Sequence, residues 1–222
     1  MDREEFIRKQ TREVISYLGF YDKKTSGKEL ENVIKTYKYV IQNIVSNPEY
    51  SEKANNLGLV ENYMQLLEIA LTENPGSPAT NSILFHHLLT NINQKSYIVK
   101  CKSNKSETPH ICNLVRIGRQ YYYFDATLDR SILDERLFSA NDLMLCAGMG
   151  KTEYERLYTP VEALRKVDRG AKKSKEPFSK ISDESIGRII VNSINLKIPN
   201  LRRNPKQRTA QTEKNEEDME IE

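Results

Sequence analysis

The sequence places one of its three histidines fifteen residues before an aspartate, and this pair is the clearest candidate for chemistry. The stretch from Pro109 to Arg130 reads PHICNLVRIGRQYYYFDATLDR, with His110 near its start and Asp125 toward its end. Alternating residues on both sides of Gly118 predict two strands joined by a compact turn, which is an antiparallel hairpin. A carboxylate that faces an imidazole across such a hairpin fixes the ring tautomer and raises its basicity, as an activated nucleophile requires.

This spacing permits a catalytic pair without requiring one. A structural ion pair, or an exposed histidine with no special role, fits the same positions. Asn113 lies one residue off the pairing of His110 with Asp125, so it is expected to shape the strand rather than to join the pair. The residues alone therefore leave the catalytic and the structural interpretation open.

The same stretch resembles the signature of the transglutaminase-like superfamily. In that signature a histidine and an asparagine precede a hydrophobic strand, a glycine turn, an aromatic strand and an Asp-x-Thr segment. HICNLVRIGRQYYYFDATLD follows this order, with His110, Asn113, Asp125 and Thr127 at the corresponding positions. The resemblance covers roughly residues 74–130. It implies a papain-like α+β fold with a Cys–His–Asp triad.

The residue that should supply the nucleophile is missing from its expected place. The segment GSPATNSILFHHLLTNINQKSYIVKC resembles the family helix that begins at the nucleophilic cysteine. Counting back from Leu88 and Leu89 puts that position on Pro78, and residues 1–100 contain no cysteine. The family mechanism needs a thiolate at a helix N-terminus. The resemblance therefore implies a domain that is catalytically inactive or strongly diverged.

Other possible nucleophiles have a structural interpretation as well. Ser77 could complete a Ser–His–Asp set, but the proline after it disfavours helical geometry, so a loop or capping role is expected. Cys112 points to the same strand face as His110, about 7 Å away and badly aimed for proton exchange, so we interpret it as a core residue. Cys101 and Cys146 are interpreted as ordinary buried thiols.

Composition and charge narrow the class of protein. The formal charge of +3 over 222 residues is too small to indicate nucleic-acid binding, except through a local basic segment. No apolar run approaches the roughly 20 residues of a membrane span, and the charged start MDREEFIRKQ lacks the apolar core of a secretory signal, so a cytoplasmic location is expected. Three scattered cysteines without a CxxC pair predict free thiols, and neither a metal nor a cofactor is expected.

Periodicity predicts an α+β domain over residues 1–167, with a helical N-terminal half packed on a small antiparallel sheet. Residues 1–93 are expected to be helical, and the sheet is expected to span 95–127. A brief helix is also expected for TPVEALRKV. The individual helices are predicted over 2–20, 26–45 with Ser26 as N-cap, 58–71 and 79–92, and the strands over 95–103, 110–118 and 120–127.

The C-terminal part differs in composition. Residues 168–198 are expected to form a basic linker followed by an amphipathic helix capped by Ser182. Residues 199–222 change from basic to acidic and are expected to be a disordered charged tail.

Three hypotheses for function follow. The first is a transglutaminase-like domain without activity that binds a peptide or protein segment in the former active-site cleft. The second is an active acyl-transfer or amide-hydrolysing enzyme with a non-standard nucleophile. The third is an interaction protein whose basic residues 165–208 contact an acidic partner or nucleic acid. The sequence predicts no oligomeric state.

Overall fold

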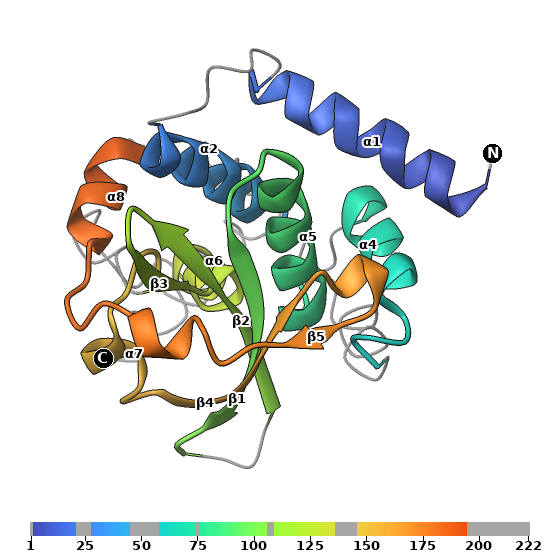
Figure 1. Ribbon diagram of the computed structural model, residues 1–222. Helices are drawn as coiled ribbons and strands as arrows, with labels where there is room; N and C mark the ends of the chain where they lie inside the picture. Colours follow the sequence, from blue (N-terminus) through green and yellow to red (C-terminus); the bar gives the residue numbers. More distant parts are fainter. Residues whose placement is uncertain are drawn as a thin grey trace, which may run out of the picture.

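Helices of the N-terminal half cover one face of a five-stranded antiparallel sheet, which confirms the α+β class (Figure 1). None of the helices in the described part of the chain is long and apolar enough to cross a membrane. The computed structural model describes residues 2–20, 28–44, 58–73, 76–105, 109–135 and 146–194.

The predicted helices of the N-terminal half are present. Asp2 caps the first one, because its Oδ1 accepts a hydrogen bond of 2.7 Å from the backbone N–H of Glu5. Ser26, the expected cap of the second helix, lies outside the described residues. The helices are α1 (Arg3–Tyr17), α2 (Glu29–Gln42), α4 (Tyr63–Thr72) and α5 (Pro78–Asn91).

Helix α5 is the central element of this layer, between α2 and α4 (Figure 1). It is buried on nearly all sides, because it packs against two helices and against the sheet. Phe85 of α5 lies 5.1 Å from the ring of Tyr37 on α2 and 5.6 Å from the ring of Phe124, centroid to centroid. These three aromatic side chains join the helical layer to the sheet.

The sheet has the strand order β3-β2-β1-β4-β5, and every neighbouring pair is antiparallel. The predicted hairpin is confirmed, because Ile117 pairs with Gln120 across a turn that starts at Gly118. Gly118 has φ +63°, a conformation that glycine adopts without a steric penalty. The strands are β1 (Ser96–Ser103), β2 (Pro109–Ile117), β3 (Gln120–Phe124), β4 (Tyr158–Arg165) and β5 (Lys172–Lys173).

The prediction of a helix for TPVEALRKV is wrong, because this segment forms most of β4. Its residues Glu, Ala, Leu and Arg favour helices, but pairing with β1 decides the outcome. Ala163 pairs with Val99 and Leu164 pairs with Ile98, and both side chains are buried, on opposite faces of the sheet. The strands expected within 95–127 are therefore three of the five in the sheet.

The sheet separates two apolar cores. The larger one lies under the helices and includes Ile98, Val115 and Phe124. The smaller one lies on the other face and is rich in tyrosine and cysteine. Its buried members are Tyr97, Val99, Cys101, Cys112, Leu114, Tyr121, Tyr123, Cys146, Met149, Tyr154 and Ala163.

The segment expected to be a basic linker is part of this sheet and of its smaller core. The backbone N–H of Ser174 donates to the carbonyl of Ala163, and that of Ser182 donates to the carbonyl of Tyr121, both at 2.9 Å. The amphipathic helix begins at Gly187, so Ser182 is not its N-cap. The expected tail at 199–222 lies outside the described residues. The remaining elements are α6 (Ala126–Glu135), α7 (Lys151–Tyr154), η1 (Val167–Arg169), η2 (Phe178–Lys180) and α8 (Gly187–Ile194).

Replacement of Ser77 should measure how much the cap of α5 stabilises the fold. Ser77 Oγ accepts a hydrogen bond of 3.0 Å from the backbone N–H of Thr80, so Ser77→Ala should lower the free energy of unfolding by about 1 kcal/mol in urea titrations. Ser131→Ala is the matched control, because Ser131 lies exposed within α6 and its loss should change stability little. Equal effects of the two substitutions would contradict the capping role.

Candidate functional site

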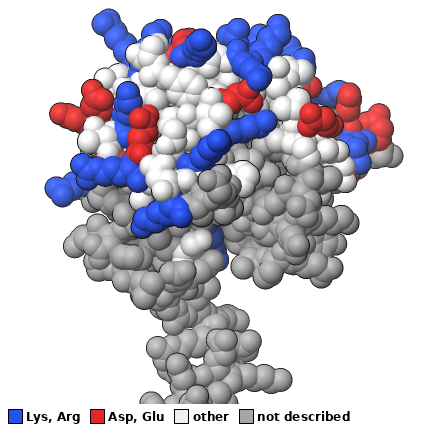
Figure 2. All heavy atoms as spheres, turned by 90° about the horizontal axis from the view of Figure 1, so that it is seen from below, with Lys and Arg blue, Asp and Glu red and all other residues white. Residues whose placement is uncertain are grey.

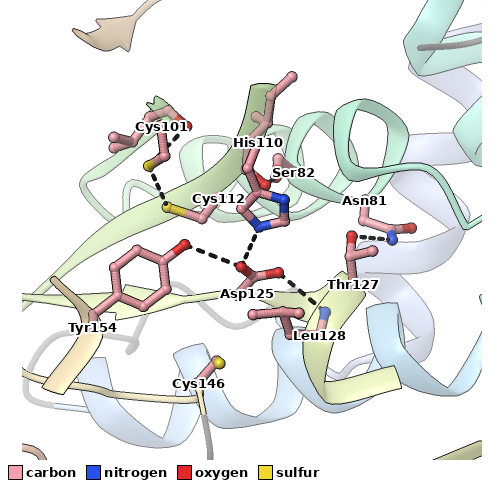
Figure 3. A network of polar contacts seen from close by, with 12 residues as sticks. Asn81, Ser82, Cys101, His110, Cys112, Asp125, Thr127, Leu128, Cys146 and Tyr154 are labelled. Carbon is pink, nitrogen blue, oxygen red and sulfur yellow. Dashed lines mark hydrogen bonds and ion pairs between the residues drawn. The ribbon is translucent and has the colours of Figure 1, made fainter. Parts of the chain in front are cut away.

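The imidazole of His110 and the carboxylate of Asp125 meet between β2 and the end of β3 (Figure 3). His110 Nε2 lies 2.5 Å from Asp125 Oδ2. The His110 side chain is 10% exposed and that of Asp125 is fully buried. The expected pairing across the hairpin is therefore present.

Asp125 also holds the chain around it in place. Strand β3 ends at Phe124, earlier than the predicted end at 127, because Asp125 is the cap of α6. Its Oδ1 accepts a hydrogen bond of 3.1 Å from the backbone N–H of Leu128. Its Oδ2 accepts one of 3.0 Å from the hydroxyl of Tyr154, on α7. Both oxygens of this buried carboxylate thus have partners.

Stacked tyrosine rings lie beside the pair, and no spacing in the sequence predicts their position there. The ring of Tyr158 at the start of β4 stacks on the His110 ring, with centroids 4.3 Å apart. Tyr154 stacks on Tyr123 at 4.1 Å, and its ring centroid lies 5.6 Å from that of Tyr158. Burial raises the pKa of Tyr158 to about 12, so its hydroxyl stays protonated at neutral pH.

The first turns of α5 are fixed next to both members of the pair. Asn113 Nδ2 donates to the carbonyl of Ser82 at 3.0 Å, and Ser82 Oγ donates to the carbonyl of Ile111 at 3.2 Å. Asn81 Nδ2 donates to Thr127 Oγ1 at 2.9 Å. Asn113 therefore ties β2 to α5, and Thr127 ties the start of α6 to the same helix.

Because Nε2 of His110 faces Asp125, Nδ1 lies on the opposite side of the ring (Figure 3). Pro78 is the first residue of α5 and is half-buried. Ser77 is fully buried, and its Oγ lies 2.9 Å from Thr80 Oγ1 as well as capping the helix. Among the described residues, no hydroxyl or thiol forms a hydrogen bond with the His110 ring.

The cysteines of the site region are buried. Cys112 Sγ lies 3.7 Å from Cys101 Sγ, and burial raises the pKa of Cys112 well above its usual range. Burial likewise raises the pKa of Cys146, and the nearby carboxylates of Asp129 and Asp125 add to that shift. Neither thiol has the electropositive, accessible surroundings that generate a reactive thiolate.

A second buried carboxyl, that of Asp129, lies one helical turn after Asp125. Burial raises the pKa of Asp129 to about 7, although its two oxygens accept hydrogen bonds from the Tyr37 hydroxyl and the Cys146 backbone N–H. The charge of Asp125 raises this pKa further. In the described part of the chain, no cluster of three or more His, Cys, Asp or Glu residues could hold a metal ion.

A scan against models of known protein families gives no match to this sequence, and a search of curated proteins also gives none.

The raised pKa of Asp129 predicts a pH-dependent stability. Because the folded state holds this proton more tightly than the unfolded chain, the contribution of Asp129 is complete below about pH 4 and is lost as the pH rises through about 7. Asp129→Asn keeps an uncharged group in this place. The free energy of unfolding of the wild type should therefore fall relative to that of the variant between pH 4 and pH 8, by on the order of 1–4 kcal/mol. Parallel urea-titration profiles for the two proteins would contradict the assignment.

Proposed function

We propose that this chain is a diverged transglutaminase-like domain that binds an extended peptide or protein segment beside His110. The observation that carries the proposal is the buried His110–Asp125 pair next to the first turns of α5, where no hydroxyl or thiol of the described residues bonds to the imidazole. The order of the elements supports it too. A helix precedes the sheet, the histidine is on the first strand of a hairpin, and the aspartate follows the second.

The edge of β4 gives this proposal a binding surface. In the described residues, β5 pairs with β4 only at Leu164 and Arg165. The first half of β4 pairs with β1 alone, so its outer edge offers backbone groups to an added strand. This edge begins at Tyr158, the residue that stacks on His110.

Apolar side chains lie exposed along the same edge. Leu157 is 38% exposed and Val161 is 56% exposed, and they flank Tyr158 in the sequence. An extended segment with apolar residues could pair with the backbone of β4 and cover these side chains. The proposed ligand is therefore an extended, partly apolar peptide rather than a small polar molecule.

The enzymatic hypothesis has less support from the described residues. Ser77 is buried and engaged in the cap of α5, and Cys112 and Cys146 carry thiols whose pKa burial raises. A serine or cysteine nucleophile must instead be accessible and bonded to its base. The hypothesis of an interaction through basic residues 165–208 is tested by none of the observations above, and residues 195–208 lie outside the described ranges, so it stays a prediction.

A cysteine placed at Pro78 should test the relation to thiol enzymes. If position 78 faces the free side of the His110 ring, the thiol of Pro78→Cys will be activated by the imidazole and by the helix N-terminus. Its pKa should then fall at least one unit below the ordinary value of about 8.5. The pH dependence of alkylation by iodoacetamide measures this pKa, with little background from the three buried native cysteines.

Two controls make this result specific. Tyr17→Cys places a thiol on the exposed side of α1, where Tyr17 is 81% exposed, and it should react with an ordinary pH profile. Adding His110→Asn to Pro78→Cys should return its profile toward that reference, with circular dichroism confirming the fold. Identical profiles for Pro78→Cys and Tyr17→Cys would remove the transglutaminase-like part of the proposal.

Peptide binding should depend on the edge of β4. Peptides selected from a displayed random library on the wild-type protein should be extended and apolar in character, and their affinity should fall about tenfold or more for Val161→Lys, because a charge then replaces an apolar contact. Tyr17→Lys is the control, since it changes an exposed aromatic residue on another element. Titration of a labelled peptide, followed by fluorescence anisotropy, measures the affinity of each variant. Equal affinities for the two variants would exclude this edge as the binding surface.

A further inference from the structure

We infer that a hollow at the far end of the sheet binds the phosphate group of a small phosphorylated molecule. The hollow has a volume of about 430 Å³, within the range of small-ligand pockets. It lies between the end of α5, the start of β1 and the end of β4. His110 pairs with Cys101 near the end of β1, whereas the hollow adjoins Ser96 at its start, so the two places are separate.

The charges around the hollow favour an anion. Four cationic side chains line it, those of Lys95, Arg165, Lys166 and Arg169, against the single carboxylate of Asp168. Lys95 is paired with Glu176 at 2.7 Å, and Arg169 approaches Asp168 at 3.7 Å.

The other two cations, Arg165 and Lys166, are exposed and make no ion pair with any residue in the described ranges. The guanidinium of Arg165 suits the geometry of a phosphate group.

Two buried polar atoms in the lining lack partners. Ser96 Oγ and His86 Nδ1 form no hydrogen bond with any of the described residues, although Ser96 and His86 are only 4% and 2% exposed. Burial lowers the pKa of His86 to about 3, so its ring is neutral and offers one donor and one acceptor. Buried polar groups are normally bonded, and their exceptions concentrate where a ligand or ion completes them.

The backbone of the lining is also unusual. Asn93 at φ +61° and Lys166 at φ +50° are the two residues other than glycine with positive φ in the described part of the chain. Both residues line the hollow, although Asn93 follows α5 and Lys166 follows β4 in the chain. Asn93 owes its positive φ to the end of α5, because the N–H of Gln94 donates to the carbonyl of Leu89 at 2.9 Å in the turn that closes the helix. Lys166 has no such role in a helix end, and its left-handed backbone lies beside the unbonded polar atoms and the unpaired cations of the hollow.

A small phosphorylated molecule fits these observations better than a nucleic acid. Figure 2 shows Lys and Arg side chains spread over the described part of one face, so weak attraction for polyanions is not confined to the hollow. The buried polar atoms of the hollow, in contrast, can be contacted only by a molecule that is small enough to enter it. The phosphate would lie against Arg165 and Lys166, and the rest of the ligand would reach Ser96, His86 and the amides of Asn91 and Asn93.

Binding of inorganic phosphate, glucose 6-phosphate and adenosine monophosphate tests the inference, with thermal unfolding followed at constant ionic strength. We expect at least one of the two phosphate esters to raise the unfolding midpoint in a saturable manner. Arg165→Ala and Ser96→Ala should each weaken its apparent affinity about tenfold or more. Ser96→Ala should not destabilise the free protein, because the hydroxyl that it removes has no hydrogen-bond partner among the described residues. Lys172→Ala is the matched control, since Lys172 pairs with Arg165 across the β4–β5 ladder and does not line the hollow.

The outcomes distinguish binding in the hollow from non-specific attraction to the positive charges of the surface. Affinity lost in Arg165→Ala and Ser96→Ala but kept in Lys172→Ala supports the site, and a failure of the peptide experiments would leave that result intact. No stabilisation by any of the three phosphates overturns it, as does an equal response in all variants. A short single-stranded oligonucleotide that binds more tightly than the phosphate esters, and that Lys172→Ala weakens as much as Arg165→Ala, would assign the charges to a nucleic-acid surface instead.

Discussion

The buried carboxylate of Asp125 is the constraint on which the surrounding structure depends. A charge removed from water must be paired and fully hydrogen-bonded, or it destabilises the fold by several kcal/mol. Asp125 meets this requirement with His110 from β2, the backbone of Leu128 in α6 and the hydroxyl of Tyr154 in α7. One side chain thus connects a strand and two helices, and any shift of these elements would leave an unpaired acid in the interior.

The same carboxylate adds to the pKa shifts of the neighbouring groups, whose largest cause is burial. Asp129 has two hydrogen-bond donors, yet its pKa is raised, because burial and the charge of Asp125 together outweigh those bonds. The thiol of Cys146 and the hydroxyl of Tyr154 have raised pKa values, from burial first and from nearby charge second. The interior around His110 therefore disfavours a second anion. That environment is opposite to the one that would generate a nucleophilic thiolate.

The hairpin and the His110–Asp125 pair could be predicted because they are local in sequence. Strand alternation, Gly118 as the turn and the spacing of the two residues determine their positions. The tyrosines of the site could not be predicted in the same way. Tyr154 and Tyr158 come from a segment that reaches the pair only through the tertiary fold, and TPVEALRKV carries helix-forming residues. Pairing of Ala163 and Leu164 with β1 makes it a strand, and no local pattern encodes that pairing.

Strand β4 contributes to both proposed sites, and its geometry argues that the two act separately. Tyr158 at its start stacks on His110, and Arg165 at its end lines the basic hollow. Seven residues of extended chain separate their backbones by about 23 Å. The intervening Ala163 and Leu164 are buried and paired with β1, while β5 adds a second partner for Leu164. A strand paired with β1 along its length and with β5 at its end cannot slide without breaking both ladders, so an occupant of one site has no simple means of moving the other.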